Sequence, residues 1–287
     1  MPADKYTAVW VSHSSMSDYL KCPRSYFLKN VYRNPETGRK VQIATPQLSL
    51  GQAVHNTLEA LSVLPTDKRF LEPLIDRFDT SWKKVSGKKG GFFDEVTENT
   101  YRERGRVMIE RVHKNPGPLK NLAVKIHMDI PNYWLSEEEN IILCGKLDWL
   151  EYDQATDSVS IIDFKTSKSD ESKESMQLPI YCLLAQNTQK RKVTGASYWY
   201  LERNDEPTPV EIPDLLEAEE KILKTARQIK VARQLERFKC EYGGCNSCKP
   251  FEAIIDGRAE LVGSDETNRE IYVLREDTAA EDVSEIL

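Results

Sequence analysis

The chain has 287 residues, of which 30% are charged, and its formal net charge is −6. This length is enough to bury a full hydrophobic core and suits one elaborated domain. No apolar run approaches the roughly 20 residues that a membrane span requires, and the N-terminus lacks a charged start followed by an apolar stretch. The composition therefore predicts a cytoplasmic protein with no membrane partner.

The negative charge is concentrated at the C-terminal end of the chain. Residues 252–287 contain 3 basic and 11 acidic residues and so carry −8, which leaves +2 for residues 1–251. Two stretches, 21–40 and 224–239, are basic, each with six Lys or Arg against one Glu. Solvated helix faces explain such stretches on charge alone, and a surface that binds nucleic acid is the alternative. We expect residues 252–287 to form an acidic tail peripheral to the core.

The first third of the sequence predicts helices. The segment 12–32 has apolar residues at helical spacing, and Pro23 interrupts it, so we expect two short helices there. The same spacing predicts a helix within 48–64 and two more within 67–85 and 97–114.

The character of the sequence changes after residue 121. Segments rich in branched and aromatic residues predict three adjacent antiparallel strands, and a turn-like DQATD segment closes a hairpin between 140–153 and 158–167. The predicted strands are 122–130, 140–153, 158–167 and 195–202, with helices over 176–188 and about 213–238. This order indicates an α/β layer arrangement with one central mixed sheet flanked by helices.

The strand segment IIDFKTS carries an aspartate and a lysine two residues apart. Side chains alternate across a strand, so Asp163 and Lys165 share one face. The hairpin can bring Asp148 of the preceding strand beside Asp163. Two close carboxylates repel each other unless a cation lies between them, and Mg²⁺ or Mn²⁺ prefers such oxygen ligands. A cross-strand salt bridge is the alternative explanation, because an isolated D-x-K pattern is common.

The motifs around this hairpin resemble a known family. CGKLDWLEYD and IIDFKTS, preceded by GQAVH and followed by MQLPIY, are similar to the RecB-like branch of the PD-(D/E)XK nuclease superfamily, over most of residues 12–250. The family's four motifs correspond to Gly51 and His55, to Gly145 and Asp148, to Asp163 and Lys165, and to Gln177 and Tyr181.

The resemblance implies a restriction-endonuclease-like core and a catalytic role for each of these motif residues. Metal ligands would be His55, Asp148, Asp163 and the carbonyl of Phe164. Lys165 would assist the attacking water, and Gln177 and Tyr181 would shape the site near DNA. Taken alone, a histidine beside an apolar stripe is more often a packed core residue, and Tyr181 would be ordinary core.

The six cysteines suggest a second metal site. Cys144 and Cys182 lie in a predicted strand and a predicted helix, where an inert buried thiol is expected. Cys240, Cys245 and Cys248 form a C-x4-C-x2-C pattern, and the fourth cysteine, Cys22, is near the other end of the chain. In the cytosol such spacing favours metal over disulfides, and both zinc and an iron-sulfur cluster accept four thiolates.

A subgroup of the family supports the iron-sulfur alternative. The CRISPR-associated adaptation exonucleases and the AddB-type nuclease domains place one cysteine in a CP segment before the core and three after it, and YLKCPRSYFL resembles that first segment. The resemblance implies a 4Fe-4S cluster on Cys22, Cys240, Cys245 and Cys248. The late trio departs from the family, which has C-x2-C first, so zinc remains the alternative at this cysteine clasp.

Together these features predict a metal-dependent DNA nuclease, an exonuclease on single-stranded or end-bearing DNA. The rival is a catalytically silent DNA-binding or scaffold subunit of a helicase-nuclease or CRISPR adaptation assembly. The sequence contains no helicase P-loop pattern, so a helicase or an integrase-type partner would be another chain. The expected organisation is a helical part with the first cysteine (1–120), a catalytic core (121–212), a helix with the cysteine clasp (213–251) and an acidic tail (252–287).

Overall fold

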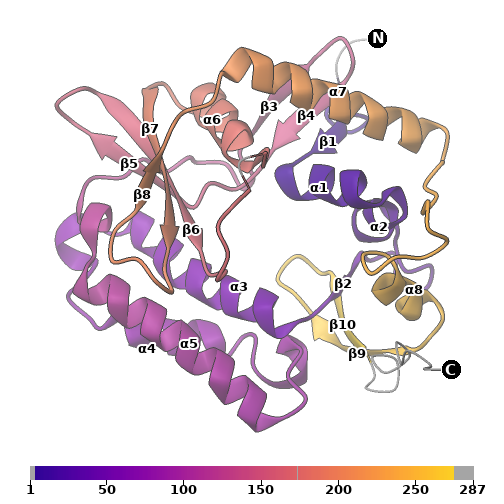
Figure 1. Ribbon diagram of the computed structural model, residues 1–287, viewed down its shortest axis with the longest axis horizontal. Coiled ribbons are helices and arrows are strands. Elements are labelled where there is room, and N and C mark those ends of the chain that lie inside the picture. Colours follow the sequence, from indigo (N-terminus) through magenta and orange to yellow (C-terminus); the bar gives the residue numbers. More distant parts are fainter. Residues whose placement is uncertain (1–3, 173, 275–287) are drawn as a thin grey trace, which may run out of the picture. The chain divides into compact units, whose positions relative to one another are not determined.

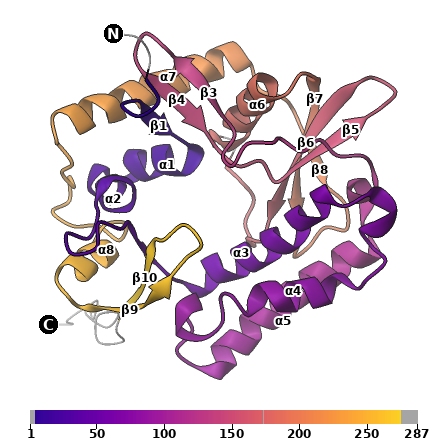
Figure 2. The ribbon, with the colours of Figure 1, turned by 180° about the vertical axis from the view of Figure 1, so that it is seen from behind.

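The computed structural model describes residues 4–172 and 174–274, and Figures 1 and 2 show it from opposite sides. Contacts between residues divide the chain into two compact units. Unit 1 comprises residues 1–13, 50–84 and 100–230, and unit 2 comprises residues 14–49, 85–99 and 231–287. Within the described residues, no helix is both long and apolar enough to cross a membrane.

Unit 1 contains two mixed sheets, whose strands are labelled in Figure 1. In the larger sheet, β5 (Trp149–Asp153) pairs antiparallel with β6 (Ser158–Lys165), β6 parallel with β7 (Lys192–Tyr200), and β7 antiparallel with β8 (Thr208–Val210). In the smaller sheet, β4 (Ile141–Cys144) pairs parallel with β1 (Val9–Val11) and antiparallel with β3 (Asn132–Ser136).

Helix α6 (Gln177–Thr188) connects the parallel strands β6 and β7, as a parallel pair requires. Its apolar side chains are buried in a core that it shares with β5, β6 and β7. Gly145, just after β4, allows this helix to approach closely, because a Cβ there would lie 2.9 Å from Leu184 Cδ1. The members of this core are Leu150, Ile161, Leu178, Cys182, Ala185, Ala196, Tyr198 and Tyr200.

The other long helices are α3 (Pro46–Glu59), α4 (Leu74–Trp82), α5 (Glu95–Lys114) and α7 (Leu215–Gln234). Close packing of α4 on α5 depends on Gly105, because a Cβ at that position would lie 2.4 Å from Phe78 Cζ. Arg102 and Arg106 of α5 both pair with Asp79 of α4, at 2.9 and 3.1 Å.

Unit 2 combines elements from both ends of the sequence. Figure 2 shows its helices α1 (His13–Lys21), α2 (Pro23–Tyr26) and α8 (Lys249–Ile255), with a π-helical turn, Phe27–Val31, after α2. Its sheet has β10 (Glu270–Leu274) between β2 (Val41–Ile43) and β9 (Ala259–Ser264). Leu28, Val41, Phe251 and Tyr272 form its core with three cysteines.

The α/β fold and most long elements agree with the sequence-based prediction, with three corrections. In place of the single central sheet, the strands of residues 4–172 and 174–274 form three sheets. The predicted strand 122–130 makes only an isolated bridge, in which Leu122 and Val124 share backbone hydrogen bonds with β5. The expected tail from residue 252 contains α8, β9 and β10 as far as Leu274, and residues 275–287 of that segment lie outside the described residues.

The position of β10 predicts where the chain can be shortened. A chain that ends at Leu274 should fold and melt within about 2 °C of the full chain, because β10 is complete. A chain that ends at Ser264 loses β10, of which Glu270 to Val273 are buried, and should lose the cooperative unfolding of unit 2. Circular dichroism melts would measure both, and equal melting temperatures would show that β10 adds nothing to stability.

Candidate active site and cysteine cluster

The centre of the candidate active site is the end of β6. Asp163 and Lys165 share one face of this strand, as the alternation predicts, and Lys165 Nζ lies 2.8 Å from Asp163 Oδ2. Their side chains are only 2% and 12% exposed. Charges this deeply buried are costly unless they are paired, so the ion pair contributes to holding both side chains in place.

Asp148 stands opposite Asp163 across the β5–β6 hairpin. The register pairs Trp149 with Ile162, which places Asp148 beside Asp163, and the Phe164 N–H donates to Asp148 Oδ2 at 2.8 Å. Burial, and then the negative charge of Asp148, raise the pKa of Asp163 to about 7, although Lys165 acts in the opposite direction. The two carboxylates therefore repel each other when both are ionised.

Helix α3 contributes two side chains one turn apart. His55 Nδ1 lies 3.2 Å from Asp148 Oδ1 and 3.5 Å from Glu59 Oε1. Burial lowers the pKa of His55, but Asp148 and Glu59 outweigh it and raise that pKa to about 10. The sequence analysis missed Glu59, which also pairs with Lys146. Its position four residues after the histidine, on the same helix face, was the available signal.

Gly51, by contrast, has no steric role that the structure reveals. A Cβ built on Gly51 would lie 3.5 Å from Thr166 Oγ1, which is an ordinary van der Waals distance. Its backbone φ is not in the left-handed region. Steric grounds therefore do not require a glycine at position 51, whereas a Cβ at Gly145 of the strand motif would lie 2.9 Å from Leu184 Cδ1.

Gln177 and Tyr181 come from the first turns of α6 and share a helix face. Gln177 Nε2 donates to Asp163 Oδ1 at 3.1 Å and to Tyr181 Oη at 3.1 Å, and its Oε1 accepts a hydrogen bond from the Lys165 ammonium. Gln177 thus links three of the predicted site residues. The structure brings together side chains of His55, Asp148, Asp163, Lys165, Gln177 and Tyr181 within unit 1.

The donor set at this site suits a hard divalent cation. Ligand atoms of His55, Glu59 and Asp148 all lie within 4.8 Å of one another. Among the described side chains, Asp163 Oδ2 is a buried oxygen that accepts no hydrogen bond, despite the nearby ammonium. Carboxylate oxygens with one imidazole nitrogen are ligands that Mg²⁺ and Mn²⁺ accept, so the residues present fit such an ion.

Four cysteines converge in unit 2. The Sγ atoms of Cys22, Cys240, Cys245 and Cys248 all lie within 4.8 Å of one another. The Ser25 N–H donates to Cys22 Sγ at 3.4 Å, and the Cys245 N–H donates to Cys248 Sγ at 3.2 Å. Burial opposes ionisation of Cys245, but N–H donors outweigh it and lower its pKa to about 6, whereas burial raises the pKa of Cys22 to about 12 and also raises that of Cys248. This arrangement is suited to binding a metal through thiolates.

The remaining two cysteines stand apart from this cluster. Cys182 is fully buried in α6, and Cys144 ends β4.

Other contacts join α2 to α8 and the residues just before it, beside the cluster. Arg24 forms a bidentate ion pair with Glu252, at 2.5 and 3.0 Å, and Ser25 Oγ donates to the Ser247 carbonyl at 2.9 Å.

Several aromatic and basic side chains that could contact nucleic acid are buried or form ion pairs within the protein. Tyr26 and Trp82 are 1% and 3% exposed, so their rings cannot stack on bases. Phe27 and Tyr32 remain half-buried. In the basic stretches, Arg24, Lys29 and Arg227 pair with Glu252, Asp18 and Glu139, which supports the simpler reading of part of this charge.

The repulsion between Asp148 and Asp163 leads to a stability prediction for the metal-free protein. Because the folded-state pKa of Asp163 is raised, the native state binds its proton more tightly than the unfolded state, and stability falls as pH rises from about 4 to about 7. Asp163→Asn removes this charge and should raise the melting temperature in EDTA at pH 8 by about 2–4 °C, with no gain near pH 4.

Asp153 provides the matched control for this change. It is exposed at the end of β5, and hydrogen bonds from Thr156 and Ala155 lower its pKa. Asp153→Asn should therefore leave the melting temperature unchanged or slightly lower at pH 8. A melting temperature for Asp163→Asn below that of the wild type in EDTA would contradict the proposed repulsion.

Comparison with known proteins agrees with this geometry. The family model of the PD-(D/E)XK nuclease superfamily matches residues 10–252. A search of curated proteins finds no match. The crystal structure of a putative exonuclease from Eubacterium rectale is similar over 84% of this chain and 87% of that chain, with 13% sequence identity and a TM-score of 0.52, a likeness of fold. The family match spans most of the sequence, so the chain belongs to the PD-(D/E)XK nuclease superfamily.

Proposed function

We propose that the chain is a divalent-metal-dependent deoxyribonuclease that hydrolyses phosphodiester bonds. The observation that carries this proposal is the convergence of Asp148, Asp163 and Lys165 at the end of one hairpin. Superfamily membership supports a phosphodiester hydrolase in general. DNA as the substrate is the finer part of the proposal, and the family resemblance of the motifs supports it.

The protein's own residues have distinct roles in this proposal. Asp148, Asp163, His55 and the Phe164 carbonyl would hold Mg²⁺ or Mn²⁺, with Glu59 beside them. When bound, the ion supplies Lewis acidity and a more acidic water. The Lys165 ammonium would donate a hydrogen bond to the attacking water or to a phosphate oxygen. Gln177 keeps Lys165 and Asp163 in a fixed relation, because it bonds to both.

An exonuclease acting on single-stranded or end-bearing DNA is the mode that we propose. The structural neighbour described as a putative exonuclease supports it, at the level of the fold. A helicase or an integrase-type protein as partner stays a prediction from the family resemblance. A scaffold without turnover is the alternative, and retention of the complete Asp163–Lys165 ion pair favours the enzyme.

The catalytic proposal is tested by cleavage of labelled single- and double-stranded DNA with Mg²⁺ or Mn²⁺. Asp163→Ala and Lys165→Ala should each reduce cleavage by about 100-fold or more, because they remove a metal ligand and a donor to the reacting groups. DNA affinity, measured by fluorescence anisotropy, should change little, since distributed Lys and Arg supply it.

Exposed residues of the same type serve as controls for these variants. Asp153→Ala in the β5–β6 turn and Lys221→Ala, whose side chain is 67% exposed on α7, should cleave at the wild-type rate. Wild-type rates for Asp163→Ala and Lys165→Ala would exclude this site. Absence of cleavage by the wild type on every DNA form, with DNA binding intact, would favour the scaffold.

We also propose that the four cysteines ligate a single 4Fe-4S cluster with a structural role. Protein purified without air should then be brown and contain iron and sulfide. Cys22→Ala and Cys245→Ala should lose colour and thermal stability together, because the cluster joins segments far apart in the sequence. Cys144→Ala and Cys182→Ala should keep the colour. Zinc as the only metal in such protein would exclude the cluster while leaving a zinc clasp.

A further inference from the structure

The ammonium of Lys165 is surrounded by more groups than the family motifs provide. Besides Asp163 and Gln177, Glu171 contacts it, with Oε2 2.9 Å from Nζ. Lys165 Nζ also lies 5.1 Å from the ring centroid of Tyr198, on β7. Glu171 follows β6 in the connection to α6, and neither the motifs nor the family comparison assigns it a role.

Glu171 differs from the other partners of Lys165 in what else it contacts. Asp163 is a proposed metal ligand, and Gln177 divides its bonds among three side chains. Glu171 stands outside the group of His55, Glu59 and Asp148. It is therefore the carboxylate that can stay with Lys165 when Asp163 holds an ion.

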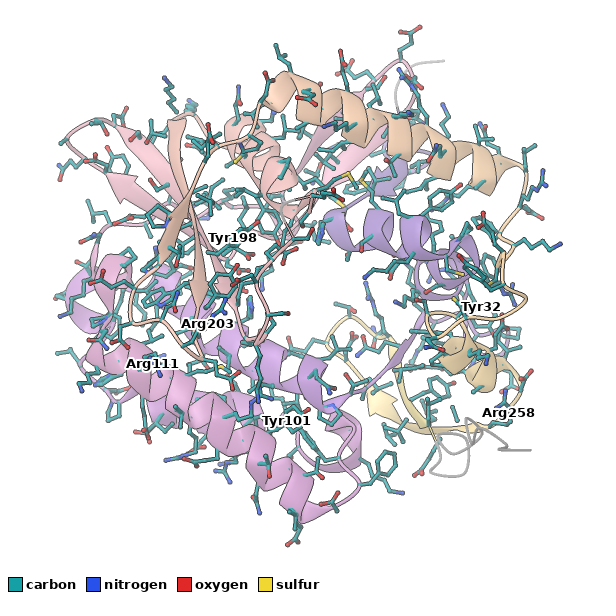
Figure 3. All side chains as sticks on the ribbon, in the orientation of Figure 1. Tyr32, Tyr101, Arg111, Tyr198, Arg203 and Arg258 are labelled. Carbon is teal, nitrogen blue, oxygen red and sulfur yellow. The ribbon has the colours of Figure 1, made fainter. Side chains whose placement is uncertain are left out.

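The segment that carries Glu171 is fixed by residues at the end of β7. The Glu171 N–H donates to Tyr200 Oη at 3.0 Å. The neighbouring Asp170 pairs with Arg203, whose guanidinium lies 4.2 Å from the Tyr200 ring centroid. Figure 3 labels Tyr198 on β7 and Arg203 just beyond its end. These contacts place the Glu171 backbone where its side chain reaches Lys165.

We propose that Glu171 is a positioning residue, which fixes the Lys165 ammonium at the reacting centre through their ion pair. This inference rests on the proposed nuclease function for its kinetic consequence only. A misplacement of a catalytic group by about 1 Å can cost about 100-fold in rate, so loss of this anchor should lower the chemical rate without changing how the substrate binds.

The first test measures the Lys165 amine directly and needs no activity. Glu171→Gln keeps the size of the side chain and removes its charge, so Lys165 should react at least about three-fold faster in reductive methylation followed by peptide mass spectrometry, because it is less firmly held. Lys221 is the internal reference. Glu174→Gln, an exposed glutamate in the same segment, is the matched control and should leave Lys165 reactivity unchanged.

The second test compares kinetics and binding in the same variants. For Glu171→Gln, the single-turnover cleavage rate should fall about 10- to 100-fold, while the dissociation constants for DNA and for Mn²⁺ stay within about two-fold of the wild type. Tyr200→Phe removes the hydroxyl that anchors the Glu171 backbone. As in Glu171→Gln, the cleavage rate should fall and the reactivity of Lys165 should rise, each by a smaller factor. It provides the test if Glu171→Gln fails to fold.

The outcomes separate this inference from the proposed function. Unchanged Lys165 reactivity in Glu171→Gln overturns the inference, whether or not the wild type cleaves DNA. A wild-type cleavage rate also overturns it, and so does a loss of Mn²⁺ affinity, which would make Glu171 a metal ligand. If the wild type cleaves no DNA, the nuclease proposal fails, and faster methylation of Lys165 would still support the positioning contact.

Discussion

Two buried carboxylates that face each other, Asp148 and Asp163, impose the main constraint on unit 1. Each bears a charge that its neighbours must compensate, and the groups that do so come from different elements. Asp148 accepts a hydrogen bond from the Phe164 N–H of β6 and contacts the imidazole of His55 on α3. Asp163 pairs with the ammonium of Lys165 on β6 and accepts a hydrogen bond from the side-chain amide of Gln177 on α6. The arrangement of strand, hairpin and two helices can be understood as the scaffold that supplies these partners.

This constraint also explains why the site lies where the hairpin and the crossover helix meet. A single hairpin can bring two carboxylates together, but it cannot neutralise both. The parallel connection from β6 to β7 places the first turn of α6 beside the end of β6, and Gln177 occupies that turn. Gly145 leaves room for the side chain of Leu184 on the same helix, which a Cβ at position 145 would approach to 2.9 Å.

Sequence reasoning predicted the parts of the structure that have a strong period or a fixed spacing. The β5–β6 hairpin follows from two apolar runs around a turn, and the shared face of Asp163 and Lys165 follows from alternation. Helix α6 was predicted to within one residue, since its apolar residues and its polar Gln177 and Tyr181 are consistently spaced. The four cysteines lie close together in space, as their C-x4-C-x2-C spacing in the sequence and the family resemblance predicted.

The parts that sequence reasoning missed lack such a local signal. Strands β2, β9 and β10 are three to six residues long, and their burial depends on each other rather than on their own pattern. The acidic composition around β9 and β10 suggested a tail, although Glu270 is buried against Asn34 and Tyr272. Glu171 belongs to no motif, and its contact with Lys165 depends on how the irregular connection between β6 and α6 folds.

The distribution of unit 2 along the sequence has a consequence for biosynthesis. Its segments lie at 14–49, 85–99 and 231–287, so the ribosome makes nearly all of unit 1 before the last segment of unit 2. At a translation rate of about 5–20 residues per second, roughly 10–40 s pass between the synthesis of Cys22 and that of Cys240. The sheets of unit 1 can form during that interval, whereas the thiol of Cys22 stays without its partners. Maturation of the cysteine cluster is therefore a late event, which follows translation of residue 248.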